Sequence, residues 1–197
     1  PPFAPPTMTR ARRPTLALLL ALAGGLAQAA PPTVRLLPEQ SRIAFTSKQM
    51  GVPVEGRFKR FDAQLTLDPL RPEDGQVLLH IDTGSAVLSP MADAELPKAP
   101  WFDSARFPQA VFRSTAIRAT TPGHLEVSGR LELKGSTRAL TVPVTIERVP
   151  GQDAVASGSF ALRRLDYKVG DGEWADTAMV ADEVRVSFRL VLAGWPP

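Results

Sequence analysis

Short segments in which apolar and polar residues alternate follow one another along most of the chain after residue 40. In the segment 76–82, for example, Val77, Leu79 and Ile81 fall on one face. Such alternation is typical of β-strands that are buried on one side. Turns rich in Gly, Pro, Asp and Ser separate the segments. The sequence therefore predicts strands at 41–47, 54–60, 61–68, 76–82, 109–118, 124–134, 139–147, 154–163 and 183–192.

Because most connections are tight turns, we expect strands that are adjacent in sequence to pair in space. The resulting prediction is an all-β fold: an antiparallel eight-stranded barrel with one short helix, with a β-sandwich as the alternative. Gly56 marks a bulge or a close approach. In the strand at 109–118, alternation places Val111 and Ile117 on one face and Phe112 on the other.

An aromatic segment at 99–114 interrupts the strands. It holds four of the chain's twelve Phe and Trp residues, and Pro97, Pro100 and Pro108 prevent one continuous helix. We predict an aromatic plug at one end of the barrel, preceded by a helix at 91–96. A well-packed loop is the alternative.

The N-terminal part has the pattern of an export signal. Residues 1–7 precede the first methionine and are not assigned to the fold. Residues 8–29 combine an arginine-rich start, an apolar stretch and the small-x-small site Ala27-Gln28-Ala29, as secretory signal peptides do. We expect cleavage near Ala30, a mature domain at 30–197 and a periplasmic location. An uncleaved N-terminal anchor is the alternative.

Net charge argues against a nucleic-acid partner. The whole chain has 23 Lys and Arg against 20 Asp and Glu, a net charge of +3. The signal contains three arginines and no acidic residue, so the mature domain is formally neutral. A neutral surface lacks the positive field that attracts nucleic acid, and we expect no such partner.

Few residues suit catalysis or metal binding. The two histidines, His80 in a strand and His124 beside a turn, are expected at the surface. No paired histidine motif, nucleophile elbow or cysteine cluster is present, so we expect no catalytic residue, no metal site and no cofactor. Acidic residues gather at 166–183. We interpret them as a solvated loop, with a cation site or a lipid-modifying hydrolase as the alternatives.

Several short segments stand in a characteristic order between Leu37 and Ala193. They are Gly56–Asp62 with Leu65–Asp68, Ile81-Asp82-Thr83, Trp101-Phe102-Asp103 with Phe107-Pro108, Val127–Gly135, and Glu173-Trp174-Ala175-Asp176. With these segments the chain resembles the YceI-like family of secreted polyisoprenoid-binding proteins. The resemblance implies a lipocalin-like antiparallel barrel that holds a long isoprenoid chain in an apolar tunnel. The chain departs from the family at residues 48–50, where the family's usual histidine is missing.

The ligand-binding candidates are apolar residues of the predicted strands and plug. Trp101 and Trp174 are expected near an opening, because an indole N–H needs a polar neighbour. The full set is Phe45, Phe58, Phe61, Leu65, Leu79, Ile81, Trp101, Phe107, Phe112, Val127, Leu131, Val142, Phe160, Trp174, Val186 and Phe188.

The functional expectation combines the barrel pattern with the resemblance. The protein is expected to bind a polyisoprenoid lipid or an isoprenoid quinone and to carry it to a membrane quinone or cytochrome protein. A homodimer is a further expectation. The alternative is a structural or stress-related secreted barrel with a filled core and no ligand.

Overall fold

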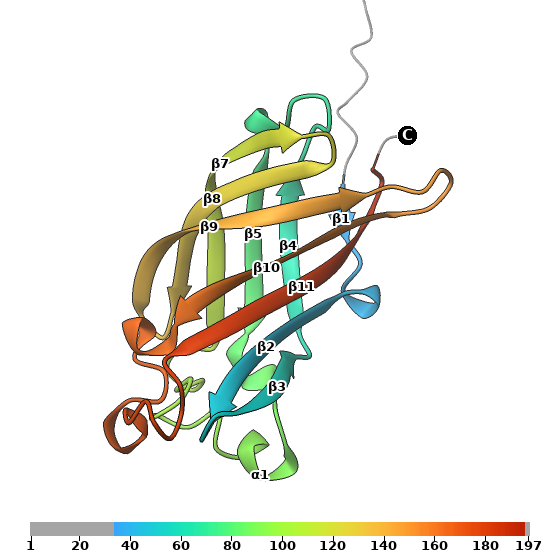
Figure 1. Cartoon of the computed structure of the whole chain (residues 1–197). Coiled ribbons are helices and arrows are strands. Elements are labelled where there is room, and N and C mark those ends of the chain that lie inside the picture. The colour runs from blue at the N-terminus through green and yellow to red at the C-terminus, as the bar shows by residue number, and fades with distance from the viewer. Residues whose placement is uncertain (1–33, 196–197) are drawn as a thin grey trace, which may run out of the picture. The chain divides into compact units, whose positions relative to one another are not determined.

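The computed structural model describes residues 34–195, so the predicted signal lies outside the described residues. Within them, eleven antiparallel strands form one sheet (Figure 1). The strands are β1 (Arg35–Leu36), β2 (Arg42–Gln49), β3 (Val52–Phe58), β4 (Phe61–Thr66), β5 (Gln76–Asp82), β6 (Ala86–Val87), β7 (Gln109–Thr121), β8 (His124–Leu133), β9 (Ser136–Glu147), β10 (Ala154–Arg163) and β11 (Glu183–Ala193).

The all-β class and the antiparallel arrangement are confirmed. The strands pair in the order β4-β5-β7-β8-β9-β10-β11-β2-β3-β6, and β1 pairs with β11. Because all of them belong to one sheet, the sandwich alternative does not hold. Nine strands in the described part have six or more residues, one for each predicted segment, whereas the barrel itself was predicted with eight strands. The expected pairing of sequence neighbours fails between β3 and β4, which follow each other but do not pair.

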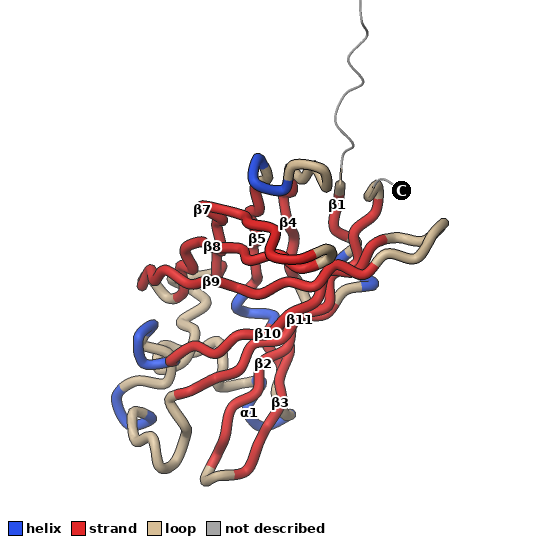
Figure 2. Tube along the Cα trace, turned by 45° about the horizontal axis from the view of Figure 1, so that its top comes forward, coloured by secondary structure: helices blue, strands red, loops and turns tan. Residues whose placement is uncertain are grey.

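The sheet curls until its two edges approach each other. Figure 1 shows β10, β11 and β2 crossing in front of the more upright β4 and β5, and Figure 2 shows the same curl from another side. At one end, β1 pairs with β11 and packs against β4. At the other end, the backbone N–H of Lys59 donates to the Ser85 carbonyl, and that of Asp82 donates to Arg60. These contacts bring together the two sides of the seam that strand pairing leaves open.

Most strands keep the predicted inward face, but β7 changes phase. Its register against β8 shifts between Ser114 and Ala116 and again between Ala119 and Thr121. A β-bulge inserts one extra residue and re-aims the side chains that follow it. As a result Phe112 and Ile117 both face the interior, although simple alternation placed them on opposite faces.

Helical structure is short. The helix α1 (Pro90–Asp93) is one turn, whereas the sequence predicted a helix at 91–96. The Ser89 side chain caps it by accepting from the N–H of Ala92, and Pro97 follows closely, which disfavours continuation. No helix in residues 34–195 is both long and apolar enough to cross a membrane.

Candidate functional site

The interior of the curled sheet contains a cavity of about 610 Å³. Residues of β2, β4, β5, β7, β8, β9, β10 and β11 line it, so both sides of the curl contribute to its wall. Nearly all of the lining side chains are aliphatic or aromatic. The interior is therefore hollow, contrary to the alternative of a solidly filled core.

Fourteen of the sixteen predicted ligand-binding residues line this cavity, although their contact with a ligand stays a prediction. They are Phe45, Phe58, Leu65, Leu79, Ile81, Trp101, Phe112, Val127, Leu131, Val142, Phe160, Trp174, Val186 and Phe188. Phe61 and Phe107 do not line it. Phe61 lies at the first residue of β4 and packs between the two clusters of buried apolar residues. Phe107 precedes β7 and lies against Gly135, with the Arg106 guanidinium 5.2 Å from its ring centroid.

Three lining phenylalanines lie over glycines of neighbouring strands. A Cβ atom at Gly56 would lie 2.4 Å from the Phe45 ring, and one at Gly129 would lie 2.5 Å from the Phe112 ring. A Cβ atom at Gly158 would likewise lie 2.7 Å from the Phe188 ring. Aromatic rings commonly cover strand glycines. Gly56 therefore marks a close approach, and the register of β2 and β3 shows no bulge there.

Polar groups of the wall gather at one end. Ser47 and Gln49 lie at the end of β2, and Ser89 and Glu95 belong to the segment around α1. The fifth polar residue of the wall is Arg164, which follows β10. None of these five residues is among the predicted ligand-binding residues. Ser47 and Gln49 were nevertheless detectable, because they continue the inward phase of Ile43 and Phe45, whereas Arg164 follows no periodic pattern.

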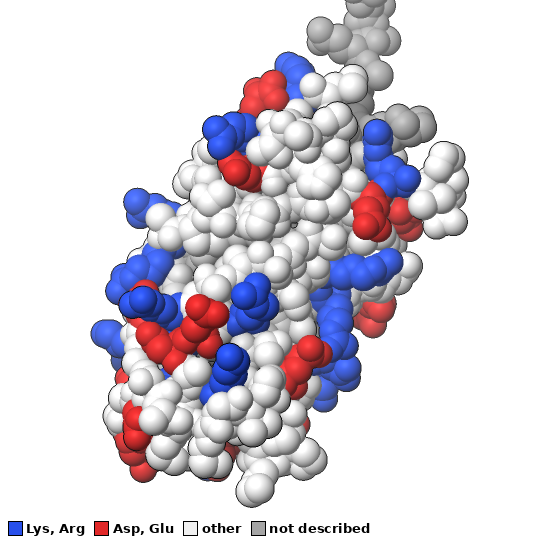
Figure 3. Space-filling view, viewed as in Figure 1, with Lys and Arg blue, Asp and Glu red and all other residues white. Residues whose placement is uncertain are grey.

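Exposed methionines mark the same end, which we call the mouth. Met50 is 77% exposed, Met91 86% and Met179 48%, and all three line the cavity. They come from the β2–β3 turn, from α1 and from the loop before β11. The visible face in Figure 3 shows Lys and Arg interspersed with Asp and Glu, whereas its lowest part, over α1 and the β2–β3 turn, is mostly uncharged. Flexible methionine side chains are common on surfaces that accommodate varied apolar partners.

A buried arginine organises the loop at the mouth. Arg164 is 3% exposed, and its guanidinium donates to the carbonyls of Val169, Gly170, Trp174, Val180 and Ala181. Burial lowers the pKa of Arg164 from its ordinary value, and the nearby Asp182 carboxylate opposes that shift. All five N–H donors are thus committed to backbone carbonyls.

The aromatic plug is tied to this loop. The Lys134 ammonium donates to the carbonyl of Lys168 at 2.6 Å and to that of Pro100 at 3.1 Å. The rings of Trp101 and Trp174 meet with centroids 5.5 Å apart. Both tryptophans line the cavity among the mouth loops, where the sequence placed them near an opening.

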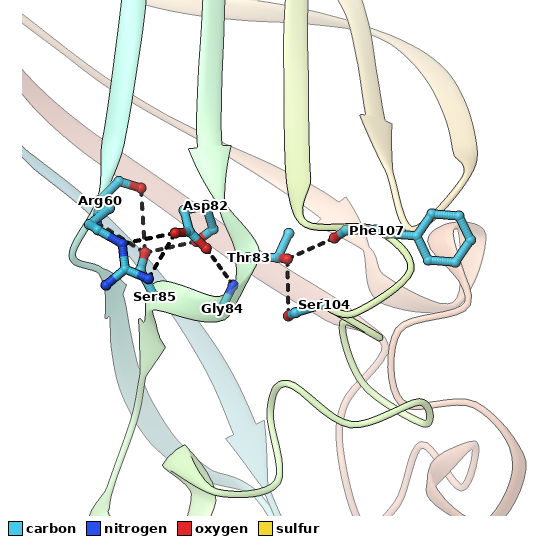
Figure 4. A network of polar contacts seen from close by, with 7 residues as sticks. All are labelled: Arg60, Asp82, Thr83, Gly84, Ser85, Ser104 and Phe107. Carbon is cyan, nitrogen blue, oxygen red and sulfur yellow. Dashed lines mark hydrogen bonds and ion pairs between the residues drawn. The ribbon is translucent and has the colours of Figure 1, made fainter.

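A polar network attaches the other side of the plug to the sheet (Figure 4). The fully buried Thr83 hydroxyl donates to the Phe107 carbonyl at 2.8 Å and lies 3.0 Å from the Ser104 hydroxyl. Asp82 accepts from the N–H of Gly84 at 2.8 Å and pairs with Arg60. The plug therefore holds its position through hydrogen bonds on both sides.

The acidic residues near the last loop have local partners. Asp171 lies 3.5 Å from the Lys134 ammonium, Asp176 accepts from the N–H of Ala178, and Asp182 accepts from the N–H of Leu165. In residues 34–195 no group of three His, Cys, Asp or Glu side chains is placed to hold a metal ion. Neither His80 nor His124 lines the cavity.

A curled antiparallel sheet around an apolar cavity with one polar end defines a lipocalin-like barrel, of the size that can enclose one small ligand. The chain belongs to the YceI-like domain family, which it matches over residues 35–192.

Relatives agree with this assignment. BcnA of Burkholderia cenocepacia is 38% identical, and its crystal structure matches with a TM-score of 0.76 over 79% of this chain and 98% of BcnA. A polyisoprenoid binding domain of Saccharophagus degradans, implicated in plant cell wall breakdown, is 15% identical; it shares the fold with a TM-score of 0.66, over 84% of this chain and 99% of that domain. A UPF0312 protein of Vibrio cholerae is 28% identical over 122 residues, which cover 59% of this chain and 65% of that protein.

Proposed function

We propose that the protein binds a polyisoprenoid lipid in its cavity, exchanges it with membranes and does not act as an enzyme. The observation that carries the proposal is a continuous apolar wall around about 610 Å³, with charged, hydroxyl and amide side chains at the mouth only. Cavities of this size enclose most of a small ligand's surface. Such a wall offers water few hydrogen bonds, which favours an apolar occupant. The Saccharophagus domain, which has the same fold, is a polyisoprenoid binding domain.

Energetics favour reversible loading. Burial of an isoprene unit stabilises it by roughly 4 kcal/mol relative to water, at about 0.8 kcal/mol per carbon. A lipid tail in a bilayer is already out of water, however, so the net affinity of the cavity for a membrane lipid is modest. Modest affinity suits a carrier that takes up a prenyl chain or quinone in the periplasm and releases it to a membrane protein.

The test is native mass spectrometry of gently purified protein, followed by transfer of a prenyl quinone from vesicles. We expect a mass above that of the polypeptide, which extraction with organic solvent removes. We also expect the protein to take up the quinone from the vesicles. Leu131→Arg, which places a charge on the apolar wall, should abolish both by emptying or unfolding the barrel, because burial of an unpaired charge costs several kcal/mol. Glu132→Arg, at the adjacent exposed position, is the matched control. A wild-type protein that neither carries nor takes up lipid contradicts the proposal.

A further inference from the structure

Two buried polar atoms on the cavity wall lack a hydrogen-bond partner. Among the described residues, Ser47 Oγ, His80 Nδ1 and Trp195 Nε1 are buried and unpartnered, and of these Ser47 and Trp195 line the cavity. An unsatisfied buried polar group costs about 1–3 kcal/mol. Such a group on the wall of a ligand cavity is a candidate contact for a polar atom of the ligand.

These two atoms lie at opposite ends. Ser47 is in β2, two residues before Gln49, at the mouth. Trp195 follows β11 and packs against the cluster of buried residues at the other end, which includes Leu36 and Leu192. Figure 1 shows the end of β2 low in the view and the C-terminal end of β11 high. The polar wall residues Gln49 and Glu95 surround only the mouth end, so a ligand with one polar head is oriented with that head near Ser47.

Charge at the mouth selects against an anionic head. Arg164 is the single cationic side chain among the described cavity-lining residues, and its donors are committed to carbonyls. Glu95 is the single anionic one, and it pairs with Lys98 at 2.6 Å. A buried phosphate needs a compensating cation, and the described wall provides no cationic side chain with uncommitted donors.

We propose that Ser47 is the head-group contact, and that its hydroxyl binds the neutral oxygen of an isoprenoid alcohol or quinone while the tail runs toward Trp195. The inference rests on the proposed lipid binding and adds a substrate class to it. A hydroxyl both donates and accepts, so Ser47 suits either a prenol hydroxyl or a quinone carbonyl.

The experiment compares three C20 prenyl probes by competition against a fluorescent lipid: the alcohol geranylgeraniol, the hydrocarbon that carries hydrogen in place of its hydroxyl, and geranylgeranyl phosphate. We expect the wild type to prefer the alcohol over the hydrocarbon about 5- to 10-fold, the equivalent of one hydrogen bond. Ser47→Ala should bring that ratio close to one while hydrocarbon binding persists. Ser47→Thr, which keeps the hydroxyl, should retain the ratio.

Trp195→Phe is the matched control, because it removes the unpartnered N–H at the opposite end. It should leave the ratio unchanged. A ratio that survives in Ser47→Ala, or that is lost in Trp195→Phe, overturns the role of Ser47. If geranylgeranyl phosphate binds more tightly than geranylgeraniol, the proposal that the head group is neutral is overturned. If the wild type binds none of the probes, the proposed lipid binding itself fails; if it binds alcohol and hydrocarbon equally, only the inference about Ser47 fails.

Thermal unfolding separates a binding role from a structural one. Loss of an unsatisfied hydroxyl should leave the ligand-free Ser47→Ala protein at least as stable as the wild type. If this variant unfolds at a lower temperature without ligand, Ser47 has a structural role and the inference is overturned.

Discussion

The two ends of the barrel are held together by different forces. At the mouth, loops before β7 and before β11 depend on side chains such as Arg164, Lys134 and Thr83, which donate to backbone carbonyls. At the opposite end, Val34, Leu36, Ala154, Ala156 and Leu192 form a cluster of apolar contacts between paired strands. Strands satisfy their own backbone groups, whereas loops need side chains to do so. The polar bonds of the mouth can therefore be altered without loss of the barrel, and four variants test this difference between the ends.

The largest effect is expected at the mouth. Arg164→Met removes five donors to backbone carbonyls and should destabilise the protein by about 3–5 kcal/mol. Urea unfolding measures the decrease in the free energy of unfolding. Amide hydrogen exchange should increase most, relative to the wild type, in residues 169–181. Arg163→Met, at the exposed neighbouring position, is the control. Uniform exchange across the sheet would show that the two ends are not separable.

At the opposite end, Leu192→Ala should cost about 2–5 kcal/mol, because Leu192 is 3% exposed and truncation leaves a void in the apolar cluster. Hydrogen exchange should rise in β1 and β11, and the mouth loops should keep their protection. Leu70→Ala, at a residue that is 90% exposed, should leave stability unchanged. Faster hydrogen exchange at residues 169–181 in this variant would contradict the independence of the two ends.

A smaller effect is expected for the bond between the plug and the sheet. Thr83→Val keeps the side-chain shape but removes the donor to the Phe107 carbonyl, and should cost about 1–3 kcal/mol. Thermal unfolding measures the loss, with Thr137→Val on an exposed position of β9 as the control. Equal stability of the two variants would show that the network of Figure 4 does not hold the plug.

The smallest effect on stability is expected for the exposed Met91 at the mouth. Met91→Asp changes a side chain that is 86% exposed, so the free energy of unfolding should stay within about 0.5 kcal/mol of the wild type. The rate of quinone uptake from vesicles should nevertheless fall, because a charge at the mouth opposes the passage of an apolar tail. Val149→Asp, in the β9–β10 turn, is the matched exposed control. Equal uptake by both variants would show that loading does not use the mouth.

The periodicity of the sequence was sufficient for the fold class and for most of the cavity wall. Strict alternation in β5, β8, β9 and β11 predicted their inward faces, because side chains on a strand alternate with a period of two. The prediction failed in β7, where a bulge at Ser114 changes the phase and turns Ile117 to the side of Phe112. It also failed for Phe61 and Phe107, because apolar character alone does not say which buried surface a side chain joins.

Tertiary structure decided whether the barrel is hollow and which end is polar. The rings of Phe45, Phe112 and Phe188 cover glycines on other strands, an arrangement that depends on strand register. The mouth brings together Ser47, Arg164 and the three exposed methionines from segments far apart in sequence. Sequence determines local period and burial tendency, because these depend on neighbours along the chain. The cavity and its polarity depend on how distant strands curl and align, so only the folded structure specifies them.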